Sequence, residues 1–225
     1  MVGSAGQQRV RRDFFEHFQL RLPPLPQQRY IADILDTVDR AIRKTEEVID
    51  KLERIKKGLL HDLLTRGIDE NGELRDPERH PEQFKDSPLG RIPREWEPGV
   101  LKDFYRERSR NGLYKPSQYH GRGPVMVQMG NIFRGSDVSF AGASRVAVDS
   151  SELRKYGLRK GDLLFGRRSL VLEGAGKCAL VRELPEPATF ESSIVRVRLD
   201  ESQFRPPFAA LFLQDPRSYR ARRKF

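Results

Sequence analysis

Residues 26–66 read PQQRYIADILDTVDRAIRKTEEVIDKLERIKKGLLHDLLTR, and this stretch decides much of the fold. Pro26 suits the first turn of a helix, where its missing N–H costs no hydrogen bond. No glycine or proline follows until Gly58. Apolar residues recur at alternating steps of four and three, broken only by Thr45 and Lys56, which predicts one long helix with a heptad seam. The predicted helix-packing residues are Ile31, Leu35, Val38, Ile42, Ile49, Leu52, Leu59 and Leu63.

A seam of this length predicts a partner helix, because one helix cannot bury an apolar stripe alone. At a rise of ~1.5 Å per residue the helix would extend roughly 60 Å, which is longer than a small domain is wide. The alternative is that the helix packs on its own domain. Gly67 is expected to end the helix as a left-handed cap, with Ile68 folding back onto Leu63 or Leu64.

The remaining chain divides into three segments around this helix. Residues 1–25 form a short basic head, residues 67–97 form a connector rich in turn residues, and residues 98–225 read as a globular unit. The expected fold class is therefore α+β, with a long coiled-coil helix joined to a mixed α/β domain. Within that domain we expect strands near 124–129, 145–148, 162–165, 177–182 and 194–199, and helices near 151–156 and 207–214.

Positive charge is concentrated in the last segment. The chain of 225 residues has a formal net charge of +10 and a pI of about 9.9. The long helix is balanced, with nine basic and eight acidic residues, whereas residues 98–225 hold 24 lysines and arginines against 13 aspartates and glutamates. This pattern favours a nucleic-acid partner for residues 98–225. An anionic membrane is the weaker candidate, and no apolar run approaches the ~18 residues that span a bilayer.

Several polar residues of this segment are candidates for DNA contact. Residues 104–135 contain several lysines and arginines but only one acidic residue, Glu107. Tyrosines and phenylalanines are interleaved with these cations. Gln128 and Asn131 offer the paired donor and acceptor that suit adenine. The alternative is that these amides satisfy backbone groups and that the arginines touch only phosphates. The candidate DNA-binding residues are Arg108, Arg110, Lys115, Tyr119, Arg122, Gln128, Asn131, Arg134, Arg167, Arg168 and Ser169.

Motifs for catalysis are incomplete. Residues 174–177 read GAGK, but a phosphate-binding loop would need glycine at Val171 and serine or threonine at Cys178. Residues 205–208 read RPPF, and arginine has no acceptor to bind a target amino group, so a structural helix start is favoured. The single cysteine excludes an internal disulfide and a cysteine cage for zinc. The histidines lack ligand spacing, and Glu191 has no evident base or metal partner. We therefore predict neither catalytic residues nor metal ligands.

Four motifs in order resemble those of the specificity subunits of type I restriction–modification systems. Residues 22–32 (LPPLPQQRYIA) resemble the Pro-Leu-x-x-Gln-x-x-Ile-Ala that begins the conserved helix of that family. Residues 56–67 (KKGLLHDLLTRG) resemble the end of the same helix, Lys-x-x-Leu-x-x-x-Leu-Leu-Thr-x-Gly. Residues 89–96 (LGRIPREW) and 158–165 (LRKGDLLF) resemble two motifs of its target-recognition domain.

The resemblance implies sequence-specific recognition of double-stranded DNA by a subunit without catalytic residues. Its implied partners are methyltransferase subunits and restriction subunits, which would carry S-adenosylmethionine, ATP and Mg²⁺. It also implies that residues 1–25 are the tail of a preceding recognition domain and that residues 98–225 are a target-recognition domain that stops early.

The chain is smaller than the family pattern, which has two recognition domains and two conserved helices. The chain is accordingly expected to be a half-subunit that forms a homodimer, one half of a larger subunit, an inactive fragment or a silent recombination cassette. The expected location is the cytoplasm. Two other classes remain open: a coiled-coil adaptor with a basic nucleic-acid-binding domain, and a cryptic methyltransferase or nuclease.

Overall fold

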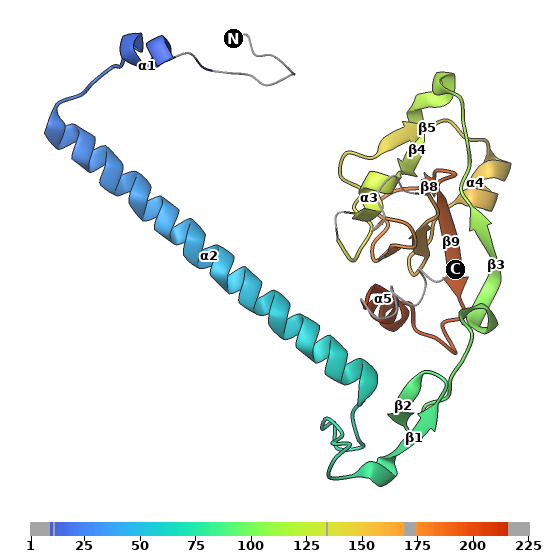
Figure 1. Ribbon diagram of the computed structural model, residues 1–225. Helices are drawn as coiled ribbons and strands as arrows, with labels where there is room; N and C mark the ends of the chain where they lie inside the picture. The colour runs from blue at the N-terminus through green and yellow to red at the C-terminus, as the bar shows by residue number, and fades with distance from the viewer. Residues whose placement is uncertain (1–9, 11, 134, 169–173, 216–225) are drawn as a thin grey trace. The chain divides into compact units, whose positions relative to one another are not determined.

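The structure is a computed structural model that describes Val10 and residues 12–133, 135–168 and 174–215 (Figure 1). Contacts divide the chain into two compact units, Met1–Lys56 and Lys57–Phe225. A short helix, α1 (Arg12–His17), is followed by the long helix α2 (Leu25–Thr65), which runs without interruption for 41 residues. The long helix was predicted at 26–66, so this prediction is confirmed to within one residue at each end. In the part of the chain that the structure describes, no helix is both long and apolar enough to cross a membrane.

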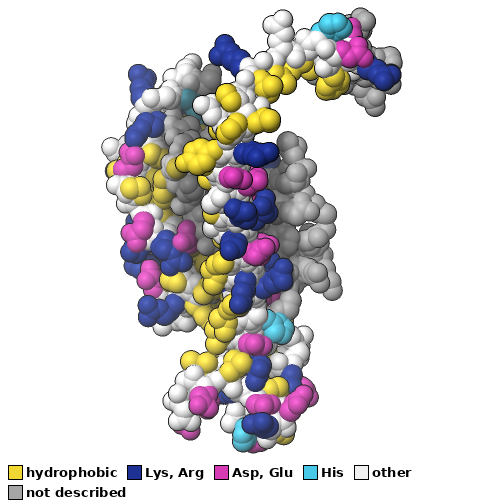
Figure 2. All heavy atoms as spheres, turned by 90° about the vertical axis from the view of Figure 1, so that its left-hand side faces the viewer, with side chains coloured by type: hydrophobic (Ala, Val, Ile, Leu, Met, Phe, Trp, Pro, Cys, Tyr) yellow, Lys and Arg dark blue, Asp and Glu magenta, His cyan; other side chains and the backbone are white. Residues whose placement is uncertain are grey.

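Helix α2 leaves its apolar residues uncovered. The eight predicted packing residues are between 44% and 59% exposed. A second apolar column, Ile34, Val48 and Ile55, lies beside them and is similarly exposed. Figure 2 shows these hydrophobic side chains as a band along the helix, bordered by charged side chains. This exposed band is the face that a partner helix or another surface would have to cover.

The connector is more ordered than its turn residues suggested. Gly67 has a φ of 63°, as a left-handed cap requires, and a Cβ there would lie 2.9 Å from both Arg75 Nη1 and Trp96 Cζ2. Ile68 bridges Leu74 in an antiparallel pair and is 51% exposed, and its packing onto Leu63 or Leu64 stays a prediction. Farther along, a hairpin that was not predicted joins β1 (Phe84–Ser87) to β2 (Gly90–Pro93).

Two sheets form the frame of the following segment (Figure 1). The larger has the strand order β3-β9-β6-β7, with antiparallel neighbours: β3 (Tyr105–Asn111), β9 (Ile194–Leu199), β6 (Leu163–Gly166) and β7 (Cys178–Leu180). The smaller has the order β5-β4-β8. In it, β4 (His120–Val127) is antiparallel to β5 (Ser144–Val146) and parallel to β8 (Ala188–Phe190). Three helices accompany them: α3 (Met129–Phe133), α4 (Ser150–Tyr156) and α5 (Pro206–Gln214).

The larger sheet separates two hydrophobic clusters. Neighbouring residues of β6 point to opposite faces, as strand geometry requires. Leu164 joins a cluster with Ile132 and Phe190, whereas Leu163 joins a second cluster with Leu213 of α5. The helix α5 thus covers one face of this sheet, and the cluster containing strands β4 and β8 covers the other.

Most of the regular elements predicted in this segment are confirmed. Strands β4, β5, β6, β7 and β9 and helices α4 and α5 coincide with the predicted segments within a few residues, and Pro206 begins α5. Strands β3 and β8 were missed. Strand β3 reads YRERSRN and lies at the edge of its sheet with mostly exposed residues, so it lacks the apolar alternation of a half-buried strand. Strand β8 has only three residues.

Candidate nucleic-acid interface

Strand ends converge at one edge of the C-terminal unit. The register pairs Asn111 at the end of β3 with Val195 of β9, and Gly166 at the end of β6 with Ile194. Strand β4 runs parallel to β8 and ends beside it. The ends of four strands therefore meet the turn that joins β8 to β9.

Backbone hydrogen bonds hold this turn in place. Leu113 N donates to Phe190 O at 3.0 Å, and the N–H of Glu191 donates to the carbonyl of Val127 at 3.0 Å. On the other side, Arg167 N donates to Ser193 O at 2.8 Å. We call the surface formed by residues 110–119, 128–131, 167–168 and 191–193 the loop edge.

Arginine side chains are available at and near the loop edge. Arg167 and Arg168 are exposed directly after β6, and Arg108 is exposed on β3. None of the three forms an ion pair with another described residue. Arg110 is half-buried, and its Nε has no hydrogen-bond partner among the described residues. The exposed guanidinium groups of Arg108, Arg167 and Arg168 can therefore donate to a phosphate or a base edge, whereas the Nε of Arg110 is buried.

Lys115 has an internal role. Its ammonium group forms an ion pair with Glu152 Oε1 at 2.6 Å and lies 4.8 Å from the centre of the Tyr119 ring. The hydrogen bond to Glu152 raises the pKa of Lys115. The same bond, together with the backbone N–H of Asp149, lowers the pKa of Glu152. Lys115 thus ties the loop edge to helix α4, although DNA contact by this residue remains a prediction.

The two amides differ in availability. Asn131 is 5% exposed, and its Oδ1 accepts a hydrogen bond from the backbone N–H of Gln128 at 2.9 Å. Asn131 therefore satisfies a backbone group, which was the alternative for this residue. Gln128 is half-buried, and its side chain makes no hydrogen bond to another described residue. Gln128 remains the better candidate for a base contact.

One further candidate, Arg122, lies on β4. Arg122 is exposed between Gly121 and Gly123, each with a φ of 90°. A Cβ at Gly123 would lie 2.5 Å from Val146 O, so the strand can approach β5 here only with glycine. Arg122 occupies the first half of β4, whereas the loop edge adjoins the end of that strand. Arg134 and Ser169 lie outside the described residues.

Helix α4 is fixed by a capping box. Asp149 accepts hydrogen bonds from the backbone N–H groups of Ser151 (2.7 Å) and Glu152 (2.8 Å). In turn, the carboxylate oxygen Oε2 of Glu152 accepts a hydrogen bond from the backbone N–H of Asp149 at 3.0 Å. These bonds to backbone N–H groups lower the pKa of Asp149. The capping box orients Glu152 toward Lys115, so it also positions the 114–119 loop.

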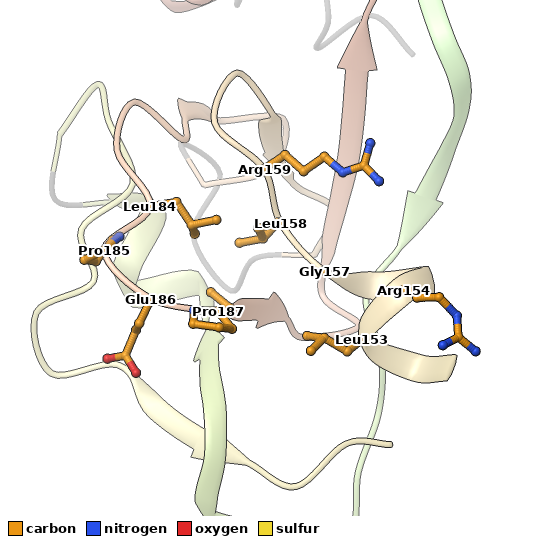
Figure 3. Close-up of a pocket in the computed structure, with 10 residues that line it drawn as sticks. Leu153, Arg154, Gly157, Leu158, Arg159, Leu184, Pro185, Glu186 and Pro187 are labelled. Carbon is orange, nitrogen blue, oxygen red and sulfur yellow. The ribbon is translucent and has the colours of Figure 1, made fainter. Parts of the chain in front are cut away.

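One pocket of the C-terminal unit is lined by both apolar and charged residues. It has a volume of about 520 Å³ and lies between α4 and residues 184–188 (Figure 3). Leu158 and Leu184 line it, whereas Arg154 and Arg159 point away from these leucines. The carboxylate of Glu186 already pairs with Arg145 at 2.9 Å. We assign no chemistry to this pocket.

A smaller pocket belongs to the loop edge itself and includes residues that the sequence did not single out. Its volume is about 340 Å³. Gln128 lines it, as predicted, but Glu191 and Ser192 line it too. Glu191 was set aside because no base or metal partner was evident. Recognising β8 would have placed it in a turn between strands, where loop side chains converge. The lining residues are Leu113, Tyr114, Lys115, Ser117, His120, Met126, Gln128, Glu191 and Ser192.

Comparisons with known families point to one group of proteins. Residues 1–54 match the family described as "Type I restriction modification DNA specificity domain". The MjaVIII specificity subunit of a type I restriction enzyme from Methanocaldococcus jannaschii is 28% identical over 194 residues. That match covers 83% of this chain and 41% of the relative. The EcoKI specificity subunit from Escherichia coli is 26% identical over 207 residues, covering 90% of this chain and 41% of the relative.

A comparison with solved structures gives an alignment over most of this chain. The crystal structure of the HsdS subunit from Thermoanaerobacter tengcongensis aligns with a TM-score of 0.45 and 15% sequence identity. This alignment covers 88% of the present chain and 43% of the other. The chain spans about two fifths of the length of the curated relatives that it matches.

Proposed function

We propose that this chain, a relative of the type I restriction enzyme specificity subunits, recognises a DNA sequence through its C-terminal unit. The loop edge carries this proposal. It brings Arg110, Arg167, Arg168 and Gln128 together on strand ends that backbone hydrogen bonds hold rigidly. Guanidinium groups bind phosphates and guanine, and a glutamine amide suits adenine.

We also propose that the chemistry belongs to other subunits of the system and not to this chain. In the described ranges, no group of three or more histidine, cysteine, aspartate or glutamate side chains could hold a metal ion. Lys177, the lysine of the glycine-rich stretch, donates to Phe133 O at 2.7 Å. Methyltransferase and restriction subunits would supply S-adenosylmethionine, ATP, Mg²⁺ and the chemistry. The proposed compartment is the cytoplasm.

The exposed band of α2 is the proposed surface for assembly. A second copy of the chain, or the second half of a larger subunit, would cover the eight predicted packing residues. The width of the band supports this, because Ile34, Val48 and Ile55 extend it beyond the eight packing residues. The charged flanks of α2 are balanced and give no reason to expect DNA on that helix.

Binding to duplex DNA at several salt concentrations tests the recognition role. We expect binding by the full chain to weaken steeply with salt, with a slope of about −0.9 in log K per phosphate neutralised. A peptide of residues 25–65 should not bind, because its charge is balanced. Tight binding by this peptide would contradict the assignment of DNA contact to the C-terminal unit.

Co-expression with the methyltransferase subunit of the same system tests the complete proposal. Mapping of methylated adenines in the host DNA should reveal one sequence that depends on this chain. The competing proposal is a coiled-coil adaptor that binds nucleic acid without reading sequence. It predicts salt-dependent binding with no base preference and no methylation pattern.

A further inference from the structure

A carboxylate occupies the small pocket of the loop edge. Glu191 is half-buried there, in the turn between β8 and β9. Its Oε1 accepts a hydrogen bond from the backbone N–H of Met129 at 2.7 Å. Its own N–H donates to Val127 O at 3.0 Å, so both the backbone and one carboxylate oxygen are held. The side chain is therefore oriented before any ligand arrives.

This carboxylate has no cationic partner among the described residues. Lys115 lines the same pocket, but its ammonium group is paired with Glu152 at 2.6 Å. A carboxylate has about four acceptor sites on two oxygens, and Met129 occupies only one of them. Glu191 thus offers an oriented, negatively charged acceptor on a unit that is otherwise positive.

Phosphates cannot be the ligand of this acceptor, since two negative groups repel each other. Base edges can, because adenine N6 and cytosine N4 present amino donors in the major groove. Gln128 lines the same pocket, with its backbone fixed by Asn131 at 2.9 Å, and offers an amide beside the carboxylate. The pocket therefore combines the acceptor carboxylate of Glu191 with the amide of Gln128, which offers both a donor and an acceptor.

We infer that Glu191 accepts a hydrogen bond from the exocyclic amino group of one adenine or cytosine, and that Gln128 contacts the same base pair. This inference rests on the proposed function, because it needs the loop edge to face the DNA major groove. It assigns to Glu191 the selection of adenine over guanine, or of cytosine over thymine, at one position of the target.

Glu191→Gln is the sharpest test of this role. Glutamine can still accept from Met129 N through Oε1, but its amide nitrogen turns the other acceptor into a donor. Selection of randomised duplexes by the full chain should show one position where the parent prefers adenine or cytosine. In the variant, the ratio of binding to the preferred base over binding to guanine or thymine should fall by about 5- to 150-fold, so that the preference shifts toward guanine or thymine. Glu183→Gln, on an exposed carboxylate paired with Lys160 outside the pocket, should leave every preference unchanged.

A second measurement uses the unaltered protein, so it does not depend on the folding of a variant. The amino-bearing base is replaced by purine or by pyrimidin-2-one, which lack the amino group. The parent chain should lose binding to this duplex by about 5- to 150-fold relative to the natural site. The salt dependence should not change, because no phosphate contact is removed.

Three results would overturn the inference. If Glu191→Gln tightens binding to all sequences equally and keeps every preference, the carboxylate only repels DNA. If the parent reads sequence but loses less than twofold with the amino-free bases, the inference fails and the proposed function stands. If the parent shows no base preference at all, the proposed function fails, and the inference fails with it.

Discussion

At the scale of single residues, a buried ion cluster joins β9 to the turn before β6. Asp162 is 1% exposed and accepts bonds from Arg198 at 2.6 and 2.8 Å and from Arg159 N at 2.7 Å. Glu107 of β3 accepts from Arg196 at 2.9 Å and from Arg198 at 2.7 Å. Burial lowers the pKa of Arg196, and the neighbouring Arg198 lowers it further. The cluster holds together strands whose ends build the loop edge.

Asp162→Ala should therefore be severely destabilising. The change leaves Arg198 without its main partner at a site where the guanidinium is only 11% exposed. Removal of one member of a buried pair costs about 3–5 kcal/mol of unfolding free energy. The control Asp137→Ala removes an exposed pair with Arg182 and should cost about 1 kcal/mol or less. Urea unfolding followed by circular dichroism compares the two. Similar losses would argue against a structural role for the cluster.

At the scale of elements, helix α2 has an exposed apolar face that another surface must cover if the helix is to be stable in water. Eight packing residues and a second apolar column lie exposed along its 41 residues. Helices of proteins owe most of their stability to packing of an apolar face rather than to intrinsic propensity. The assembly role proposed for α2 rests on this exposed face.

Ile42→Asp combined with Ile49→Asp should abolish assembly through α2, because two charges would enter the apolar contact. Light scattering should show the mass of one chain for the variant and a larger mass for the parent. The control variant is Arg43→Asp combined with Lys57→Asp, which places two aspartates on the opposite face of the helix. It should keep the mass of the parent. If the parent is itself monomeric and the variant has the same mass, the assembly surface lies elsewhere.

The capping box of α4 predicts a pH dependence. Hydrogen bonds to backbone N–H groups lower the pKa of Asp149, and the bond from Lys115 lowers that of Glu152. A carboxylate with a lowered folded-state pKa adds stability above its unfolded pKa, roughly 4, and loses it as the pH falls through the folded pKa. Asp149→Asn with Glu152→Gln keeps an amide cap but removes both titrations. The parent should melt at a higher temperature at pH 7, and the difference should shrink below about pH 4. A pH-independent difference would exclude this linkage.

At the scale of the whole molecule, the two proposed roles, recognition and assembly, fall on different units of the chain. The unit that ends at Lys56 has 11 lysines and arginines against 9 aspartates and glutamates, and it holds the exposed apolar face. The other unit holds most of the excess positive charge and the loop edge. Recognition and assembly are thus separated along the chain, and each can be altered without the other.

If two identical copies assemble through α2, the target should be an interrupted inverted repeat. A closed pair of identical chains has two-fold symmetry, and each loop edge would then read the same half-site on opposite strands. Mapping of methylated adenines after co-expression with the methyltransferase measures this directly. Two different half-sites would indicate instead that the chain works with a distinct second half.

The sequence by itself determined the elements whose signal is local. The seam and the terminal Pro26 and Gly67 defined the long helix, because heptad spacing and capping act within a few residues. The same holds for the strand that follows Gly161 and for the uneven charge. For the loop edge, the sequence singled out Gln128 and the arginine pair after β6, which lie there, but it set Glu191 aside.

Only the tertiary structure decided which side chains meet. Strands β3 and β8 lack an apolar alternation of useful length, so their pairing with β9 and β4 depends on contacts distant in sequence. The fold buries Asn131 against the backbone of Gln128, and it places Glu191 in the same pocket as Gln128 although 63 positions separate them. Hydrogen-bond partners and burial arise from such long-range packing, which a local pattern of residues does not encode.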